Sequence, residues 1–135
     1  MTSTDTSNSE IETAVREVLD RLQETWSAGD ADAVADLYTE DATLVMTGVF
    51  INGREEIRKF MTDAFAGPLV GSRPHNVPRI IRAVGADTAL VNSDIGIILA
   101  GNDRVAEGDE RVATWALTRR DDRWLIAAYH NCPVG

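Results

Sequence analysis

The sequence has one cysteine, Cys132, and one lysine among 135 residues. A single cysteine excludes a disulfide within the chain, so we expect a reducing compartment and a cytoplasmic protein. No apolar run approaches the roughly 20 residues that a membrane-spanning helix needs, so we expect no membrane partner. The first residues lack the basic start and apolar stretch of a secretory signal peptide, and we predict a disordered tail over residues 1–8.

Acidic residues outnumber basic residues by 22 to 13, which gives a net charge of −9. The imbalance lies in residues 1–67, which hold 14 acids and 5 bases, whereas residues 68–135 hold 8 of each. An acidic surface repels a phosphate backbone, so nucleic acid is not an expected partner. The length and the 44% of apolar residues are typical of one folded domain. We place this domain at residues 9–132, followed by a short end at 133–135.

Three helices are predicted in the first half of the chain. Ser9–Glu12 matches a capping box and begins a helix over residues 9–28, in which apolar side chains recur at helical spacing. Asp30 is the predicted N-cap of a short helix over residues 31–38. A third helix with the same apolar spacing ends at Gly67-Pro68.

Apolar and polar residues alternate in the remaining segments, which is the period of a strand. A hairpin is predicted over residues 43–51. Longer antiparallel strands are predicted over residues 74–82, 88–100, 104–119 and 123–132. Strands of this length in a small protein have to bend around a core. The order of helix, helix, hairpin, helix and antiparallel strands indicates an α+β fold.

Four segments in this order carry a resemblance to a known family. They are Trp26-Ser27-Ala28-Gly29-Asp30, Leu37-Tyr38-Thr39-Glu40-Asp41-Ala42, Gly53-Arg54-Glu55-Glu56-Ile57 and Trp124-Leu125-Ile126-Ala127-Ala128-Tyr129-His130-Asn131. Together they resemble the nuclear transport factor 2-like superfamily in its SnoaL-like branch. The likeness is closest to the SgcJ/EcaC group, which is found in actinomycete gene clusters that make polyketides, notably enediynes. The resemblance covers about residues 9–132.

This resemblance implies a cone-shaped, strongly curved, mixed or antiparallel sheet of about six strands, described as a cystatin-like roll. Three helices from the N-terminal half would enclose a pocket with the sheet, and a homodimer would form across the outer face of the sheet. The superfamily includes isomerases, dehydratases, cyclases and association domains. The fold therefore does not fix the chemistry.

For this chain the resemblance implies a pocket protein of secondary metabolism with a small hydrophobic or polyketide-like ligand. Three functions stay open. The first is cofactor-free proton transfer, as in cyclisation, isomerisation or dehydration. The second is a non-catalytic accessory protein that shields or channels a reactive polyene product or assists a polyketide synthase, and the third is a dimeric association module. We expect no cofactor and no metal, because the sequence has no glycine-rich dinucleotide fingerprint and no metal-ligand spacing.

Asp94, His75 and His130 are the candidates for acid–base catalysis. Asp94 lies in an otherwise apolar strand, where a carboxylate either faces water or is buried beside a partner. If both histidines face the cavity, either can move protons near neutral pH. The alternatives are an exposed His75 and a His130 that lies at the rim. On the last strand we predict that His130 faces inward together with Ile126 and Ala128. A shift of one residue would reverse this assignment.

Aromatic and polar side chains are the candidates for substrate binding. They are Trp26, Tyr38, Phe50, Phe60, Thr114 and Asn131. The tryptophan and the tyrosine have polar tips that need partners when they are buried, and these tips or the asparagine amide could donate to a developing oxyanion. The alternative for the aromatic residues is core packing. Arg111 and Trp115 share one face of their strand, which is either the cavity or the dimer surface.

Overall fold

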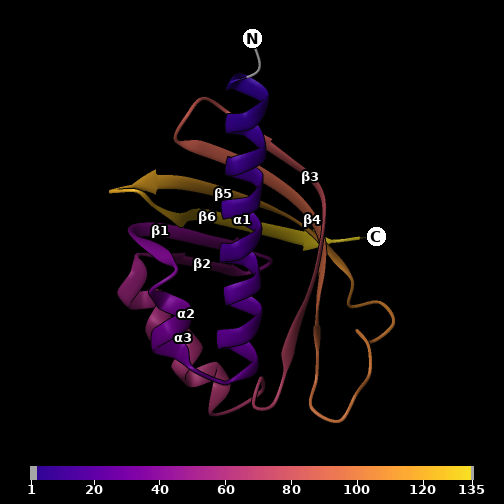
Figure 1. The fold of residues 1–135 in the computed structure, drawn as a ribbon. Coiled ribbons are helices and arrows are strands. Elements are labelled where there is room, and N and C mark those ends of the chain that lie inside the picture. The colour runs from indigo at the N-terminus through magenta and orange to yellow at the C-terminus, as the bar shows by residue number, and fades with distance from the viewer. Residues whose placement is uncertain (1–2, 135) are drawn as a thin grey trace.

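The computed structural model describes residues 3–134, with side chains described from Asn8 onward. Nine elements follow one another in these residues (Figure 1). They are α1 (Ser3–Ser27), α2 (Ala31–Ala35), β1 (Tyr38–Met46), β2 (Val49–Asn52), α3 (Arg54–Phe65), β3 (Arg73–Ala83), β4 (Thr88–Ile98), β5 (Arg111–Arg120) and β6 (Arg123–Pro133). None of the described helices is long and apolar enough to cross a membrane.

The six strands form one curved, open sheet in the order β2-β1-β6-β5-β4-β3. Neighbouring strands are antiparallel except for β1 and β6, which are parallel. The three helices all precede β3 in the chain. The predicted α+β class with a mixed, curved, six-stranded sheet is therefore confirmed.

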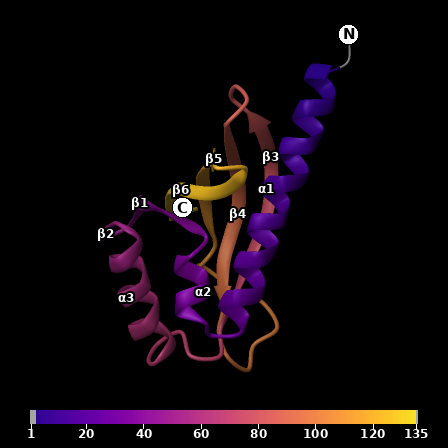
Figure 2. The ribbon, with the colours of Figure 1, turned by 60° about the vertical axis from the view of Figure 1, so that its left-hand side comes forward.

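The helices pack on one side of the sheet. Helix α1 crosses the sheet and lies beside β3, whereas α2 and α3 lie near β1 and β2 (Figures 1 and 2). The inner side of α1 carries Val15, Leu19 and Leu22, which join Val91 and Leu117 of the sheet in the buried core. Burial of each such side chain stabilises the fold by about 1.5–3 kcal/mol.

Short-range contacts fix how the helices enter the sheet. The Asp30 side chain accepts a hydrogen bond from the amide of Ala33 at 3.0 Å, so the predicted N-cap of the second helix is confirmed. Arg54, in the first turn of α3, donates from Nε and Nη2 to the carbonyl of Tyr38 at 2.9 and 2.7 Å. This pair of bonds ties α3 to the start of β1 and holds the backbone of Tyr38 in place.

Several predicted boundaries are wrong. Helix α1 begins at Ser3 rather than Ser9, because extending an existing helix by another turn costs far less than nucleating one. Of the predicted tail, residues 1 and 2 lie outside the described residues, as does Gly135. Strand β5 begins at Arg111 instead of residue 104, and residues 99–110 form a loop. Two left-handed glycines, Gly101 and Gly108, with φ of 84° and 88°, interrupt strand geometry there.

Candidate functional site

A cavity of about 430 Å³ lies between the helices and the inner face of the sheet. Both helix α1, through Leu22 and Trp26, and helix α3, through Phe60 and Met61, contribute to its wall. The strands supply the opposite wall, and most of the lining is apolar. Binding sites for small molecules have this size and character.

The face of each strand decides which side chains reach the cavity. On β5 the inner residues are Arg111, Ala113, Trp115 and Leu117, so the face that carries Arg111 and Trp115 is the cavity face. On β6 the register shifts, because Ala116 pairs with Ala128 whereas Leu117 pairs with Ile126. Ala127 is the extra residue of this β-bulge. A bulge of one residue reverses which face the following side chains occupy.

The bulge places Tyr129 and Asn131, rather than His130, on the cavity wall. Ile126 lies before the bulge and is fully buried, as the predicted face requires. His130 lies after it and is exposed, opposite Thr114 of β5. The prediction that His130 faces inward is therefore wrong, and the extra residue at position 127 is the physical reason.

Four of the predicted binding residues line the cavity, namely Trp26, Tyr38, Phe60 and Asn131. The indole N–H of Trp26 is already occupied, since it donates to Ser72 Oγ at 3.0 Å. Ser72 in turn donates to the carbonyl of Leu69 at 2.7 Å. Trp26 is thus fixed as an apolar wall of the cavity.

The other two predicted binding residues lie outside the cavity. Thr114 is on the outer face of β5, where its hydroxyl accepts a hydrogen bond from Asn92 Nδ2 at 3.0 Å. Phe50 is 68% exposed because its position in the short edge strand β2 points away from the helices. Both residues were candidates for substrate binding, and neither faces the cavity.

The three acid–base candidates do not converge. Asp94 lies on the outer face of β4 and forms an ion pair with Arg79 at 2.8 Å, with 40% of its side chain exposed. His130 is also on the outer face. His75 is exposed but belongs to the cavity lining, at the start of β3. His75 shares the face of β3 that carries Val77, which pairs with Asp94 on the outer face, so none of the three side chains points into the cavity.

The polar wall of the cavity is built from β5 and β6. Arg111 Nη1 donates to Asn131 Oδ1 at 3.3 Å, and Asn131 Nδ2 donates to the Tyr129 hydroxyl at 2.8 Å. The ring of Trp115 packs on Tyr129, with centroids 4.1 Å apart and planes tilted by 38°. Asp109, just before β5, is the acidic residue of the lining.

Burial keeps the tyrosines of this wall protonated. It raises the pKa of the Tyr129 hydroxyl to about 12, against the opposing effects of the Asn131 hydrogen bond and the positive charge of Arg111. Burial, and then the neighbouring Tyr129, also raise the pKa of Tyr38 far above its ordinary value. Both hydroxyls are neutral hydrogen-bond donors at physiological pH.

Sequence reasoning did not select Tyr129 and left Arg111 and Trp115 undecided. A signal was present in the spacing, since Tyr129 and Asn131 are two residues apart on one strand, as are Arg111 and Ala113. Residues at this spacing share a face. What the sequence did not show was the bulge that turns the Tyr129 face toward the helices.

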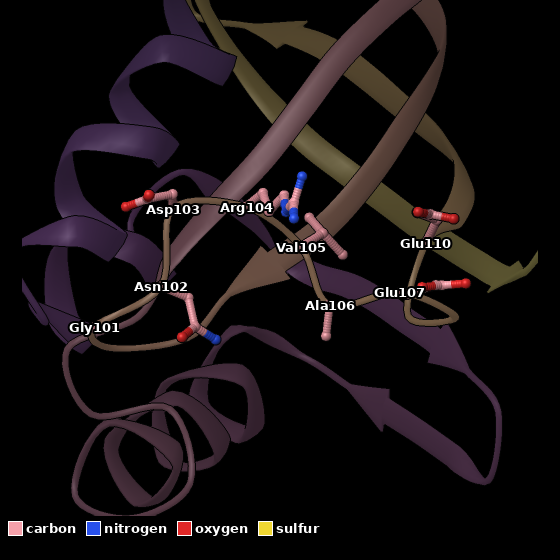
Figure 3. A pocket seen from close by; sticks show the side chains of 8 residues that line it. All are labelled: Gly101, Asn102, Asp103, Arg104, Val105, Ala106, Glu107 and Glu110. Carbon is pink, nitrogen blue, oxygen red and sulfur yellow. The ribbon is translucent and has the colours of Figure 1, made fainter.

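A second, open concavity is formed by the β4–β5 loop over residues 101–110. Asp103 lies toward one end of this loop and Glu107 and Glu110 toward the other, so the carboxylates do not meet at one point (Figure 3). Over the part of the chain that the structure describes, no group of three or more potential ligands could hold a metal ion. The cavity on the inner face of the sheet is therefore the candidate site.

The cavity, the curved sheet and the three helices define a class of protein. The arrangement is a cystatin-like fold. More narrowly, the chain belongs to the family of SnoaL-like domains, whose model matches residues 15–134. No curated protein matches the sequence.

Solved structures share this fold. A domain of unknown function from Nostoc punctiforme, with a cystatin-like fold, has a TM-score of 0.82 and 25% identity over 92% of this chain and 77% of its own. Two proteins come from Novosphingobium aromaticivorans. One carries a provisional assignment as a scytalone dehydratase, with a TM-score of 0.77, 16% identity and coverage of 100% and 89%. The other is provisionally assigned as an aromatic ring hydroxylase, with a TM-score of 0.73, 21% identity and coverage of 91% and 88%.

Proposed function

We propose that the protein binds a small, largely apolar molecule that carries oxygen, of the kind an aromatic or polyketide-like compound presents. The observation that supports this most is the cavity itself, which is about 430 Å³ and mostly apolar, with a polar wall at β5 and β6. Burying the ring system of such a ligand contributes about 25 cal/mol of binding free energy per Å² of apolar surface. The polar wall would orient the ligand. The resemblance to the SgcJ/EcaC group supports a role in polyketide biosynthesis.

The space inside the domain favours ligand binding over a purely structural association module. Aromatic side chains of the wall, including Trp26 and Trp115, border the cavity without filling it. The ion-paired position of Asp94 on the outer face removes the predicted general base from this space. A binding or shielding protein is therefore the function that the geometry supports best.

A second candidate is cofactor-free proton transfer in the same cavity. Asp109 lines the cavity and can accept a proton, and Tyr129 on β6 can donate a hydrogen bond to a carbonyl. A base and a donor directed at one carbonyl compound are what enolisation requires. Deuterium exchange at the carbon next to the carbonyl of 2-acetonaphthone tests this. Exchange that is lost in Asp109→Asn supports catalysis, and exchange at the rate of buffer contradicts it.

Binding itself is tested with a neutral apolar probe, N-phenyl-1-naphthylamine, whose fluorescence rises in an apolar site. We expect saturable binding of one probe per chain. Leu69 lines the cavity, so Leu69→Trp should weaken binding at least about tenfold, or about 1.4 kcal/mol. The neighbouring Val70 is 62% exposed and outside the lining, and Val70→Trp is the matched control. Equal binding by both variants, or no saturation by the native protein, would contradict the proposed function.

We also propose that the protein forms a homodimer through the outer face of the sheet. This face exposes Phe50 on one edge strand, Val77 and Ile80 on the other, and Val112 between them, each between 38% and 68% accessible, and exposed large apolar side chains on one face support an interface. Phe50→Lys should convert the dimer to a monomer in light scattering. A native mass equal to one chain would contradict the proposal.

A further inference from the structure

The hydrogen bonds of the polar wall run in one direction. The guanidinium of Arg111 has no acceptor, so the oxygen of the Asn131 amide has to face it. The Asn131 nitrogen then faces Tyr129 and donates to its hydroxyl at 2.8 Å. Because the Tyr129 oxygen accepts this bond, its own proton is left to donate to another group. Asn131 is 6% exposed, and both its amide oxygen and its amide nitrogen take part in these hydrogen bonds.

Trp115 provides a second donor beside Tyr129. The residue is 4% exposed, and its indole N–H has no hydrogen-bond partner among the described residues. A buried donor without a partner costs free energy, so a partner outside the chain, such as water or a ligand, is expected to satisfy it. Trp115 lines the cavity and packs on the Tyr129 ring, so both donors belong to one region.

Arg111 gives this wall a positive charge, and Asp109 lies in the lining of the same cavity just before β5. Arg111 is half-buried and forms no ion pair with a carboxylate among residues 8–134, whose side chains the structure describes. Its charge acts on the Tyr129 hydroxyl, whose pKa it lowers against the effect of burial. Donors and a positive charge in a poorly hydrated site favour an anionic oxygen.

We infer that the wall formed by Arg111, Asn131, Tyr129 and Trp115 binds an anionic oxygen of the ligand, such as a carboxylate or an enolate. In this arrangement Tyr129 and Trp115 donate to the oxygen, and Arg111 supplies the compensating charge. Asn131 is a positioning residue, because it holds the Tyr129 oxygen as an acceptor and so directs the proton to the ligand. The inference rests on the proposed function, since it assigns a ligand class to the same cavity.

Displacement of N-phenyl-1-naphthylamine by two ligands of equal shape tests this at pH 7. The ligands are 2-naphthoate, which is charged, and 2-naphthamide, which is neutral. The native protein should prefer the carboxylate by at least about tenfold, as expected for a charge-assisted hydrogen bond. Arg111→Gln and Asn131→Leu should reduce this preference to about twofold or less, measured as the ratio of the two affinities within each variant.

Two further variants make the result specific. Arg79→Gln removes the same charge from the outer face and should keep the native preference. Tyr129→Phe removes only a hydroxyl and should lower the preference even if a larger substitution fails to fold. Equal affinity of the native protein for the two ligands, or an equal loss in Arg79→Gln, would overturn the inference while probe binding still stands. Failure of the neutral probe to bind would instead contradict the proposed function.

Discussion

Replacing Tyr129 with phenylalanine should make the protein more resistant to alkali. The hydroxyl has a pKa of about 12 in the folded protein and an ordinary value of about 10 in the unfolded chain. The folded pKa is the higher one, so the unfolded state releases its proton first as the pH rises. The contribution of Tyr129 to stability is therefore complete below about pH 10 and is lost between about pH 10 and 12.

The size of this loss follows from the two pKa values. A difference of about two pH units corresponds to about 2–3 kcal/mol of unfolding free energy. Tyr38 titrates in both proteins. Tyr129 raises the pKa of Tyr38 in the folded protein, and Tyr129→Phe removes this effect. Tyr38 then contributes a smaller loss of stability in the variant, which widens the difference between the two proteins.

Urea unfolding followed by circular dichroism at pH 9 and pH 12 measures the loss directly. Between these pH values the native protein should lose about 2–3 kcal/mol more than Tyr129→Phe. Equal losses in the two proteins would show that the Tyr129 hydroxyl is not buried as described. The placement of Tyr129 on the cavity wall would then be refuted.

Two further substitutions test the placement of other residues. A Cβ at Gly96 would lie 2.6 and 2.7 Å from the methyl carbons of Val105, so Gly96→Ala should destabilise the fold by about 1–3 kcal/mol. Adding Val105→Ala should restore part of the stability that Gly96→Ala loses. If thermal unfolding shows that the effects of the two substitutions simply add, the contact is contradicted. Asp94→Asn breaks an exposed ion pair and should change stability by less than about 1 kcal/mol. It should leave the affinity for N-phenyl-1-naphthylamine unchanged. A tenfold loss of this affinity would show that Asp94 belongs to the binding site.

Much of the fold was predictable because local signals agreed with the tertiary structure. Asp30 has the side chain and spacing of an N-cap, and Asp121-Asp122 forms the turn between β5 and β6 with φ of 52° and 62°. Two-residue hairpins with positive φ at both positions favour aspartate, asparagine and glycine. The period-two alternation of the later strands identified the sheet, although not the loop at residues 99–110.

The candidate site was less predictable, because it depends on which face of each strand turns inward. The bulge at Ala127 has no signature of its own, and it moves Tyr129 to the cavity and His130 to the outer face. The sequence did not show the partner of Asp94. Val77 is opposite it in the ladder, and Arg79, the unpaired residue of a second register shift in β3, forms the ion pair with it. Both outcomes depend on strand register, which is fixed by tertiary packing rather than by a short stretch of sequence.

The central claim, that the cavity binds ligand oxygen at its β5–β6 wall, is tested most directly by the indole N–H signals of the three tryptophans. Trp115 has a free donor in the cavity, Trp26 donates to Ser72, and Trp124 lies outside the lining. In a ¹H–¹⁵N correlation spectrum titrated with 2-naphthoate, the Trp115 signal should move downfield the most and the Trp124 signal should stay in place. An unmoved Trp115 signal at saturating ligand would contradict the account.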